Sequence, residues 1–218
     1  MSDSPQRLLI IDDHPLFRKG VLQLIKPEPE FEVVGEASTG TEGLELAASL
    51  RPDMILLDLN MRGMDGVEVL KRIKSMGSDA RVVMLTVSDQ ADDLVAALRA
   101  GADGYLLKET EPEILLAKLK EAAMGQMILS ERLAGLLVRS MHKDVRPREP
   151  DEAGLTDQEQ RILGLIANGM SNKLIARELD IAESTVKVHV KHMLRKLNLR
   201  SRVEAAVWAV ERQRGKPR

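Results

Sequence analysis

The chain of 218 residues contains no cysteine and only four aromatic residues. Without cysteine it can form no disulfide, thiolate metal site or cysteine nucleophile, which fits a reducing compartment. It also lacks an uninterrupted apolar stretch of the roughly 18 residues that a membrane span needs. The polar start of the chain lacks the apolar region of a signal peptide. We therefore expect a cytoplasmic protein with no membrane partner.

The net charge of −2 conceals an uneven distribution of charge along the chain. Residues 1–125 carry 14 basic and 22 acidic side chains, residues 126–153 carry five of each, and residues 154–218 carry 13 basic and seven acidic. The length allows two domains, so the charge indicates an acidic domain followed by a basic one. A basic domain suits a polyanionic partner such as nucleic acid, and a chance drift of charge is the alternative.

Short apolar runs alternate with amphipathic stretches throughout the acidic domain. Because the runs are of strand length and the stretches have helical spacing, the pattern predicts five βα units with a parallel sheet. Thr39 with Glu42, and Thr110 with Glu113, fit the capping box that begins a helix. The expected strands are Leu8–Ile11, Val33–Val34, Met54–Leu57, Val82–Leu85 and Tyr105–Leu107.

Acidic residues follow two of these strands. Asp12 and Asp13 end the first strand, and Asp58 ends the third. In a flavodoxin-like strand order these two strands are neighbours, and their carboxyl ends form the edge where such sheets bind ligands. Two like charges about 4 Å apart repel by about 4 kcal/mol at an effective dielectric of about 20, so three carboxylates there need a cation. Oxygen ligands with room for water suit Mg²⁺, and ordinary turn and helix-cap chemistry is the alternative.

The last two strands end in a hydroxyl and an ammonium group. Thr86 closes the fourth strand and Lys108 follows the fifth. Together with the acids they form a set that can bind a phosphoryl group. Mg²⁺ would offset the carboxylates, Thr86 and Lys108 would hold phosphoryl oxygens, and a carboxylate would attack. Taken separately, a strand threonine and a surface lysine need no such role.

These residues and their spacing resemble the receiver domain of bacterial two-component response regulators over residues 1–125. The resemblance implies a flavodoxin-like (βα)5 fold and a sensor histidine kinase as partner. The matching stretches are "DDHP" at 12–15, "LLDLNM" around Asp58, "MDG" at 64–66, Thr86 and "GADGYLLK" at 101–108.

The resemblance also implies a role for each residue of the set. Asp58 would be the phosphoacceptor. Asp13, Asp58 and the main-chain carbonyl of Asn60 would bind Mg²⁺, with Asp12 assisting through water. The side chains of Thr86 and Lys108 would contact the phosphoryl group.

Two further residues of the receiver region are of interest. The resemblance makes Tyr105 an aromatic switch that changes rotamer when the residue at the end of the fourth strand moves, and an ordinary half-buried strand aromatic is the alternative. Arg62 stands where family members usually have proline, which adds a cation and frees the loop backbone. We expect this departure to change the lifetime of the phosphoryl group only modestly.

Residues 126–153 differ in pattern from the domain before them. An amphipathic stretch begins after Ser130 and is followed by a charged, proline-containing segment. This predicts a connector helix and then a flexible linker, with a rigid strap as the alternative.

Residues 154–218 predict a second, smaller all-α domain of four helices. Thr156 with Glu159, and Ser201 with Glu204, fit capping boxes for its first and last helices. The second and third helices are separated by "DIAE", which is typical of a helix-turn-helix.

The third of these helices has an apolar face and a basic face. Basic side chains on the outward face can reach base edges in the major groove, and Val188 can touch a thymine methyl; a solvated basic face is the alternative. The inward residues are Val186, Val190, Met193, Leu194 and Leu197. The candidate base contacts are Ser184, Lys187, Val188, Lys191 and Arg195, with His192 on the same face. The candidate phosphate contacts are Lys173, Arg177, Lys196, Arg200 and Arg202.

Residues 155–197 resemble the LuxR/FixJ-type helix-turn-helix along nearly their full length. With the receiver region, this resembles the NarL/FixJ family, and "HPLF" and "SRVEAAVWA" look most like its nitrate/nitrite regulators. The resemblance implies a transcription factor that, once phosphorylated, unmasks its recognition helix and binds double-stranded DNA as a homodimer, with RNA polymerase as a further partner. The implied dimer contacts are Val203, Ala206, Val207 and Val210. Packing of these residues within the domain is the alternative.

Two other classes of protein remain open. A metabolite phosphatase with an aspartyl-phosphate intermediate needs a second aspartate two residues after the nucleophile, and Asn60 stands there. We therefore expect no enzyme beyond the receiver's own phosphoryl transfer and dephosphorylation. The other class is a phosphorylation-independent regulator whose receiver is only a dimerisation or interaction module. Labelling by acetyl phosphate in the presence of Mg²⁺ would separate it from a phosphorylated regulator.

Overall fold

In the computed structural model the chain divides into two compact units, residues 1–124 and 125–218. The structure describes all residues except 1–3, 89, 130–152, 200 and 216–218. Nearly all of the predicted connector helix and linker therefore lies outside the described residues, as does Arg200. No helix in the described part of the chain is both long and apolar enough to cross a membrane.

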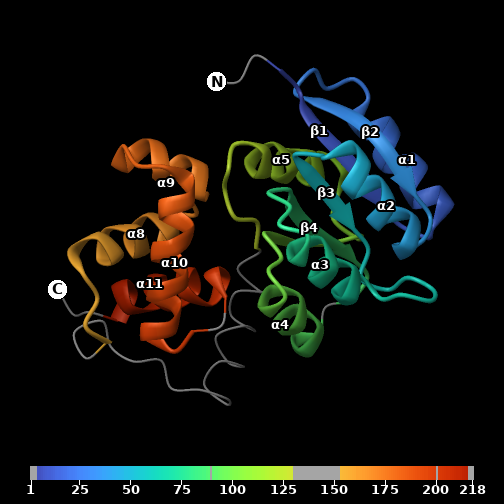
Figure 1. Ribbon diagram of the computed structural model, residues 1–218. Coiled ribbons are helices and arrows are strands. Elements are labelled where there is room, and N and C mark those ends of the chain that lie inside the picture. Colours follow the sequence, from blue (N-terminus) through green and yellow to red (C-terminus); the bar gives the residue numbers. More distant parts are fainter. Residues whose placement is uncertain (1–3, 89, 130–152, 200, 216–218) are drawn as a thin grey trace. The chain divides into compact units, whose positions relative to one another are not determined.

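The first unit is built on a sheet of five parallel strands (Figure 1). The strand order β2-β1-β3-β4-β5 is that of a flavodoxin-like sheet, so the predicted fold class is confirmed. The central strands are apolar along their whole length because helices cover both faces of the sheet. Residues 8–11 and 54–57 are at most 2% exposed. The strands are β1 Gln6–Ile11, β2 Phe31–Ala37, β3 Met54–Leu57, β4 Arg81–Thr86 and β5 Gly104–Leu107.

Five helices alternate with these strands in two groups (Figure 1). One group consists of α1 and α5, which contact each other; in the other, α3 contacts both α2 and α4. The alternation leaves the carboxyl ends of all five strands at one edge of the sheet. The helices are α1 Pro15–Ile25, α2 Gly40–Leu50, α3 Gly66–Ser75, α4 Ala91–Arg99 and α5 Pro112–Ala123.

Of the two capping predictions for this unit, the one for Thr39 is partly confirmed and the one for Thr110 is wrong. Thr39 caps α2, because its hydroxyl accepts the main-chain N–H of Glu42, although the Glu42 carboxylate accepts from Ser38 rather than from Thr39. The prediction for Thr110 is wrong. Helix α5 begins one residue later, after Glu111, because Pro112 has the fixed φ that suits the first helical position.

The second unit contains four described helices, as the sequence predicted. Thr156 and Glu159 form a reciprocal capping box at the start of the first, and Ser201 accepts the N–H of Glu204 in the last. A turn with Asp180 in the left-handed conformation joins the second and third helices. The helices are α8 Asp157–Ala167, α9 Asn172–Leu179, α10 Glu183–Leu197 and α11 Arg202–Gly215.

Candidate functional site

Three carboxylates meet at the carboxyl edge of the sheet. Strands β1 and β3 pair in parallel, and the N–H of Asp58 donates to the carbonyl of Ile11, so Asp12 and Asp58 leave adjacent strands side by side. Asp12 is 2% exposed and Asp58 1%. One ligand atom from each of Asp12, Asp13, His14 and Asp58 lies within 4.8 Å of all the others. The structure therefore brings together the acidic residues that the sequence placed at this edge.

Lys108 supplies a counter-charge to this cluster. Its ammonium group lies 2.7 Å from Oδ2 of Asp58 and 2.8 Å from Oδ2 of Asp12, and the side chain is only 7% exposed. The same ammonium lies 4.8 Å from the centre of the Phe17 ring, within the range of a cation–π contact. One ammonium cannot balance three carboxylates, so the cluster retains an excess of negative charge.

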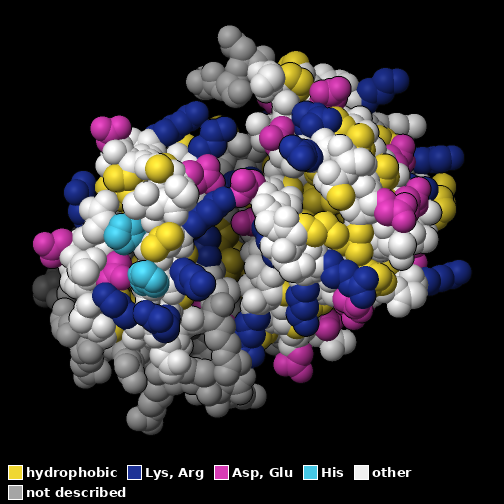
Figure 2. Space-filling view, in the orientation of Figure 1, with side chains coloured by type: hydrophobic (Ala, Val, Ile, Leu, Met, Phe, Trp, Pro, Cys, Tyr) yellow, Lys and Arg dark blue, Asp and Glu magenta, His cyan; other side chains and the backbone are white. Residues whose placement is uncertain are grey.

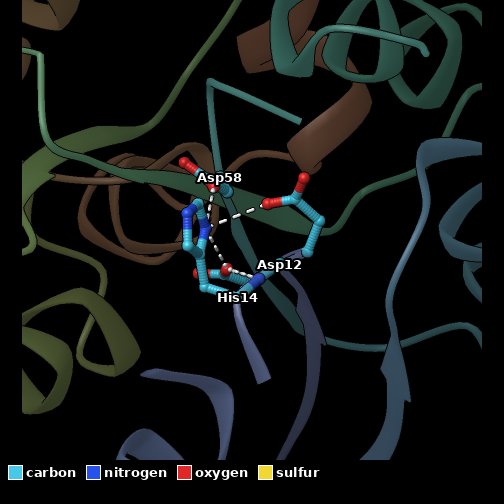
Figure 3. A group of neighbouring side chains, drawn as sticks. Asp12, His14 and Asp58 are labelled. Atoms are coloured by element: carbon cyan, nitrogen blue, oxygen red, sulfur yellow. Dashed lines mark hydrogen bonds and ion pairs between the residues drawn. The ribbon is translucent and has the colours of Figure 1, made fainter. Parts of the chain in front are cut away.

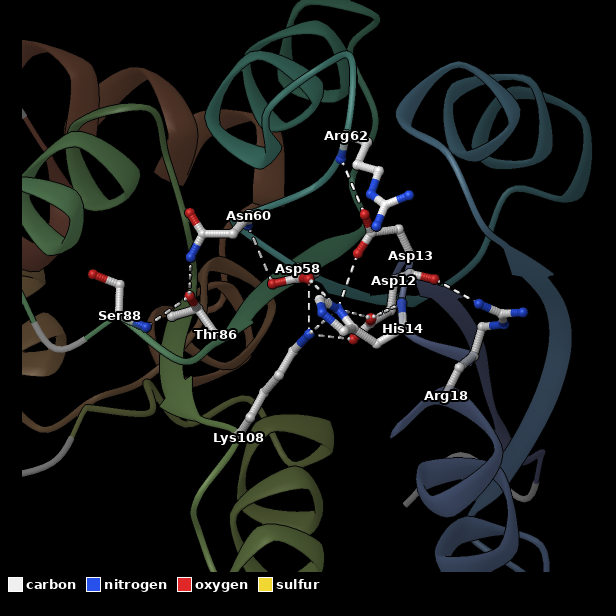
Figure 4. A network of polar contacts seen from close by, with 10 residues as sticks. All are labelled: Asp12, Asp13, His14, Arg18, Asp58, Asn60, Arg62, Thr86, Ser88 and Lys108. Carbon is white, nitrogen blue, oxygen red and sulfur yellow. Dashed lines mark hydrogen bonds and ion pairs between the residues drawn. The ribbon is translucent and has the colours of Figure 1, made fainter. Parts of the chain in front are cut away.

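Main-chain N–H groups orient the carboxylates of Asp12 and Asp13, as the N–H of Asn60 orients that of Asp58 (Figure 4). The N–H of His14 donates to Oδ1 of Asp12 at 2.8 Å, which is the turn chemistry that the sequence left as an alternative. The N–H of Arg62 donates to Oδ2 of Asp13 at 3.1 Å. The guanidinium of Arg18 fixes the main chain at the same point by donating to the carbonyl of Asp12 at 2.6 Å.

The donor set fits a divalent cation. Among the described residues, Oδ1 of Asp13 is buried and accepts no hydrogen bond, although buried polar atoms almost always have a partner. The Nδ1 atom of His14 lies 2.9 Å from this oxygen. An unsatisfied carboxylate oxygen within an excess of negative charge is the environment that Mg²⁺ occupies in proteins.

A chain of hydrogen bonds leads from Asp58 into the interior (Figure 4). The N–H of Asn60 donates to Oδ1 of Asp58 at 3.2 Å, and its side-chain amide donates to the Thr86 hydroxyl at 3.3 Å. The same hydroxyl accepts the N–H of Ser88 at 3.1 Å. The phenol of Tyr105, which is fully buried rather than half-buried, donates to the Ser88 carbonyl at 3.0 Å. Tyr105 is thus two contacts away from Thr86.

Sequence reasoning missed several groups of this site. His14 belongs to the "DDHP" motif and Phe17 to "HPLF", but neither motif indicates an imidazole beside the carboxylates or a ring beside Lys108. The contact of the Asn60 side chain with Thr86 joins residues that are 26 positions apart, so no local spacing reveals it. The contact of Phe17 with Lys108 could have been suspected only because Phe17 follows His14 by three residues, about one helical turn.

The outward face of α10 is arranged as the sequence predicted. Of the residues predicted to face inward, Val186, Val190, Met193 and Leu197 are buried and Leu194 is half-buried, whereas Val188 is 52% exposed. On the visible face of the second unit, Figure 2 shows histidine side chains among Lys and Arg side chains. The candidate base contacts, all exposed, are Ser184, Lys187, Val188, Lys191 and Arg195, and the candidate phosphate contacts Lys173 and Arg177 of α9 are exposed as well.

Two candidate phosphate contacts are instead engaged within the second unit. The Lys196 ammonium lies 2.6 Å from Oε2 of Glu159 and donates to the carbonyl of Gly154 at 3.1 Å. Arg202 donates to the carbonyl of Met170 and, at 2.7 Å, to Oδ1 of Asn172. Because both side chains tie parts of the unit together, the structure disfavours them as phosphate contacts, and that expectation stays a prediction.

The apolar stripe of α11 faces the interior. Val203, Ala206 and Val207 are between 1% and 8% exposed, and only Val210 remains half-buried. Helix α11 packs mainly against α8. This burial favours packing within the domain, the alternative that the sequence left open, over a free dimerisation surface for these three residues.

Comparison with known proteins agrees with this architecture. Residues 8–120 match the response regulator receiver domain, and residues 153–209 match the luxR family of bacterial regulatory proteins. The chain is 55% identical to the nitrate/nitrite response regulator protein NarL of Escherichia coli (strain K12) over 207 residues, 95% of this chain and 96% of that one. It is 45% identical to NarP of the same organism over 213 residues, 97% of each chain.

A solved structure supports the fold of the first unit. The receiver domain of a response regulator named NarL from Mycobacterium tuberculosis aligns with a TM-score of 0.54 and 36% identity, covering 56% of this chain and 99% of that one. The matches account for both units and their order along the chain. The protein belongs to the NarL/FixJ family of two-component response regulators, transcription factors in which a receiver domain precedes a LuxR-type helix-turn-helix domain.

Proposed function

We propose that Asp58 accepts a phosphoryl group from a sensor histidine kinase. The observation that carries the proposal is the position of the Asp58 carboxylate, buried at the sheet edge with Lys108 at 2.7 Å and two further carboxylates beside it. An Asp58 oxygen would form a bond to phosphorus as the bond between phosphorus and the kinase histidine breaks. Lys108, already at the acceptor oxygen, would then pair with the transferred group.

The cation of this site is proposed to be Mg²⁺, held by Asp12, Asp13, Asp58 and the carbonyl of Asn60. When bound, it would neutralise charge on the phosphoryl oxygens. The protein's own part is to keep the carboxylates in place, through Arg62 and Lys108, before the ion and the phosphoryl group arrive. The same site would carry out dephosphorylation, the only other chemistry we assign to the chain.

Phosphorylation would be sensed through Thr86 and Tyr105. The Thr86 hydroxyl accepts from Asn60 and Ser88 and would donate to a phosphoryl oxygen, so its movement towards that oxygen would lengthen the two bonds that it now accepts. The Tyr105 phenol donates to the Ser88 carbonyl. A shift of residues 86–88 would therefore move the hydrogen-bond acceptor of Tyr105. Such a switch requires only a few kcal/mol of difference between two states.

The output is proposed to be DNA binding by α9 and α10 as a homodimer, followed by contact with RNA polymerase. The relatives named as nitrate/nitrite regulators favour genes of nitrate or nitrite response as the targets. Unmasking of α10 on phosphorylation stays a prediction. With Val203, Ala206 and Val207 buried, dimerisation through α11 would rely on its half-buried residues, including Val210.

Acetyl phosphate tests the proposal. With Mg²⁺, the intact mass of the wild-type protein should increase by one phosphoryl group, and Asp58→Asn should abolish the increase. Asp92→Asn, which removes an exposed carboxylate of α4, is the matched control and should retain it. Labelling that persists in Asp58→Asn would contradict the assignment. No labelling of the wild type would favour the phosphorylation-independent regulator.

A further inference from the structure

His14 places an imidazole nitrogen among the carboxylates of the site (Figure 3). Its Nδ1 atom lies 2.9 Å from Oδ1 of Asp13, 3.4 Å from Oδ1 of Asp12 and 3.6 Å from Oδ2 of Asp58. No other described histidine belongs to this group: His189 and His192 lie on α10 of the other unit. The site therefore combines three oxygen donors with one nitrogen donor.

The spacing of these atoms is that of neighbouring ligands in one coordination shell. With metal–ligand bonds of about 2.1 Å, adjacent ligand atoms lie about 3.0 Å apart in an octahedron and about 3.4 Å apart in a tetrahedron. The distances from Nδ1 to the three oxygens, 2.9, 3.4 and 3.6 Å, lie close to these values. Nδ1 therefore lies where a ligand atom next to these oxygens would lie.

Without a cation, Nδ1 can form a hydrogen bond with only one of two polar neighbours. Nδ1 lies 3.4 Å from the Lys108 ammonium, which can only donate, and 2.9 Å from Oδ1 of Asp13, which as a carboxylate oxygen can only accept. One imidazole nitrogen cannot both accept from the first and donate to the second. A metal ion would bind the lone pairs of Nδ1 and Oδ1 together, and would satisfy the buried oxygen that accepts no hydrogen bond.

The local structure allows this arrangement. The main-chain N–H of His14 is held by Asp12, and Pro15 begins α1 immediately afterwards, so the backbone of His14 is fixed at the edge of the site. Its side chain is 63% exposed, so no surrounding packing prevents the small rotation that would bring Nδ1 onto an ion.

We propose that His14 Nδ1 is an additional protein ligand of the cation site and makes the site favour a divalent transition-metal ion such as Co²⁺ over Mg²⁺ more strongly than its carboxylates alone would. Imidazole suits transition metals, whereas carboxylate, carbonyl and water oxygens suit Mg²⁺. The inference shares the three carboxylates with the proposed phosphorylation site but does not depend on phosphoryl transfer.

Calorimetric titration of the full chain with Co²⁺ and with Mg²⁺, at one fixed pH, tests this proposal. His14→Asn should weaken Co²⁺ binding by about tenfold or more, because even the loss of an outer-shell partner costs about 10- to 100-fold in metal affinity. Its Mg²⁺ affinity should stay within about twofold, since the oxygen ligands are unchanged. His192→Asn removes an exposed imidazole of α10 and should change neither affinity.

A second measurement needs no variant at the site. The pulsed electron paramagnetic resonance spectrum of Mn²⁺ bound to the wild-type protein should show coupling to an imidazole nitrogen, and His192→Asn should retain it. Equal effects of His14→Asn on Co²⁺ and Mg²⁺, or a Mn²⁺ spectrum without nitrogen coupling, would overturn the proposal. If Mg²⁺ still supports labelling of Asp58 in that case, only the role of His14 fails. If neither ion binds the wild type, the proposed phosphorylation site fails too.

Discussion

The Lys108 ammonium lies 2.7 Å from Oδ2 of Asp58, and both side chains are almost completely buried. A buried ion pair of this kind is costly to break from one side, because the remaining charge keeps its desolvation penalty without its partner. Here the remaining charges would be those of Asp58 and Asp12. Lys108 therefore has a structural role before any phosphoryl group arrives.

Lys108→Met should lower the free energy of unfolding of the receiver unit by up to about 3 kcal/mol in the absence of divalent ions. Mg²⁺ should stabilise this variant more than it stabilises the wild type, because the ion replaces the missing positive charge. Urea denaturation with and without Mg²⁺ measures both effects. Lys118→Met, which breaks a half-exposed pair with Glu121, is the control and should change stability by less than about 1 kcal/mol. Equal stabilities of the two variants would contradict this role of Lys108.

Arg62 is expected to act through its main chain rather than its guanidinium. Its N–H donates to Oδ2 of Asp13, and a proline at this position has no N–H to donate. Arg62→Pro should weaken Mg²⁺ binding by about fivefold, since a hydrogen bond of this kind is worth about 1 kcal/mol. Arg62→Ala keeps the N–H and should bind Mg²⁺ as the wild type does. If Arg62→Ala is the weaker binder in calorimetry, the charge of the side chain matters instead.

The fold of the receiver unit could be predicted because its central strands are apolar on both faces. Strand β2 was predicted as only two residues and spans seven. It lies at the edge of the sheet, where the exposed Glu32 and Glu36 interrupt the apolar run. Helix starts depend on single residues, and Pro112 displaced one of them.

The site was predictable where residues follow strand ends and unpredictable where partners are distant in sequence. The register of a parallel sheet brings Asp12, Asp58 and Lys108 to one edge. In contrast, sequence shows that Lys196 and Arg202 are basic but not that they have partners 37 and 32 residues away. The exposed or engaged state of a charged side chain is a property of the packed unit.

Glu159 should make the second unit sensitive to acid. Burial, the largest influence, acts to raise the pKa of this carboxyl, but hydrogen bonds from Lys196 and from the Thr156 N–H outweigh it and lower the pKa below its ordinary value of 4.5. A carboxyl with a lower pKa in the folded chain stabilises the fold above its unfolded pKa, and this contribution is lost as the pH falls through the folded value.

Hydrogen exchange of the α8 amides, followed as the pH is lowered from about 6 to about 3, measures this loss once intrinsic exchange rates are corrected. Protection should fall in the wild type below pH 4.5 and depend less on pH in Glu159→Gln. Glu178→Gln, at an exposed position of α9, should behave as the wild type. An unchanged pH dependence in Glu159→Gln would show that other groups control acid stability.

Lys173 and Arg202 should differ in their effect on DNA binding. Lys173 is exposed on α9, whereas the Arg202 guanidinium is engaged by Met170 and Asn172. In salt titrations with a nonspecific duplex, Lys173→Ala should reduce the slope of log affinity against log salt by about 0.9, the loss of one phosphate contact. Arg202→Ala should leave the slope unchanged and lower the unfolding midpoint. A reduced salt slope in Arg202→Ala, with an unchanged slope in Lys173→Ala, would show that Arg202 contacts phosphate and Lys173 does not.

The central claim is that Asp58, together with a divalent ion, forms a site for a phosphoryl group. Beryllium fluoride imitates that group on a carboxylate, so fluorine NMR of the protein with Mg²⁺ and beryllium fluoride tests the claim most directly. We predict a bound fluorine signal that disappears when Mg²⁺ is removed and is absent in Asp58→Asn. A bound signal that survives in Asp58→Asn, or no bound signal in the wild type, would contradict the account.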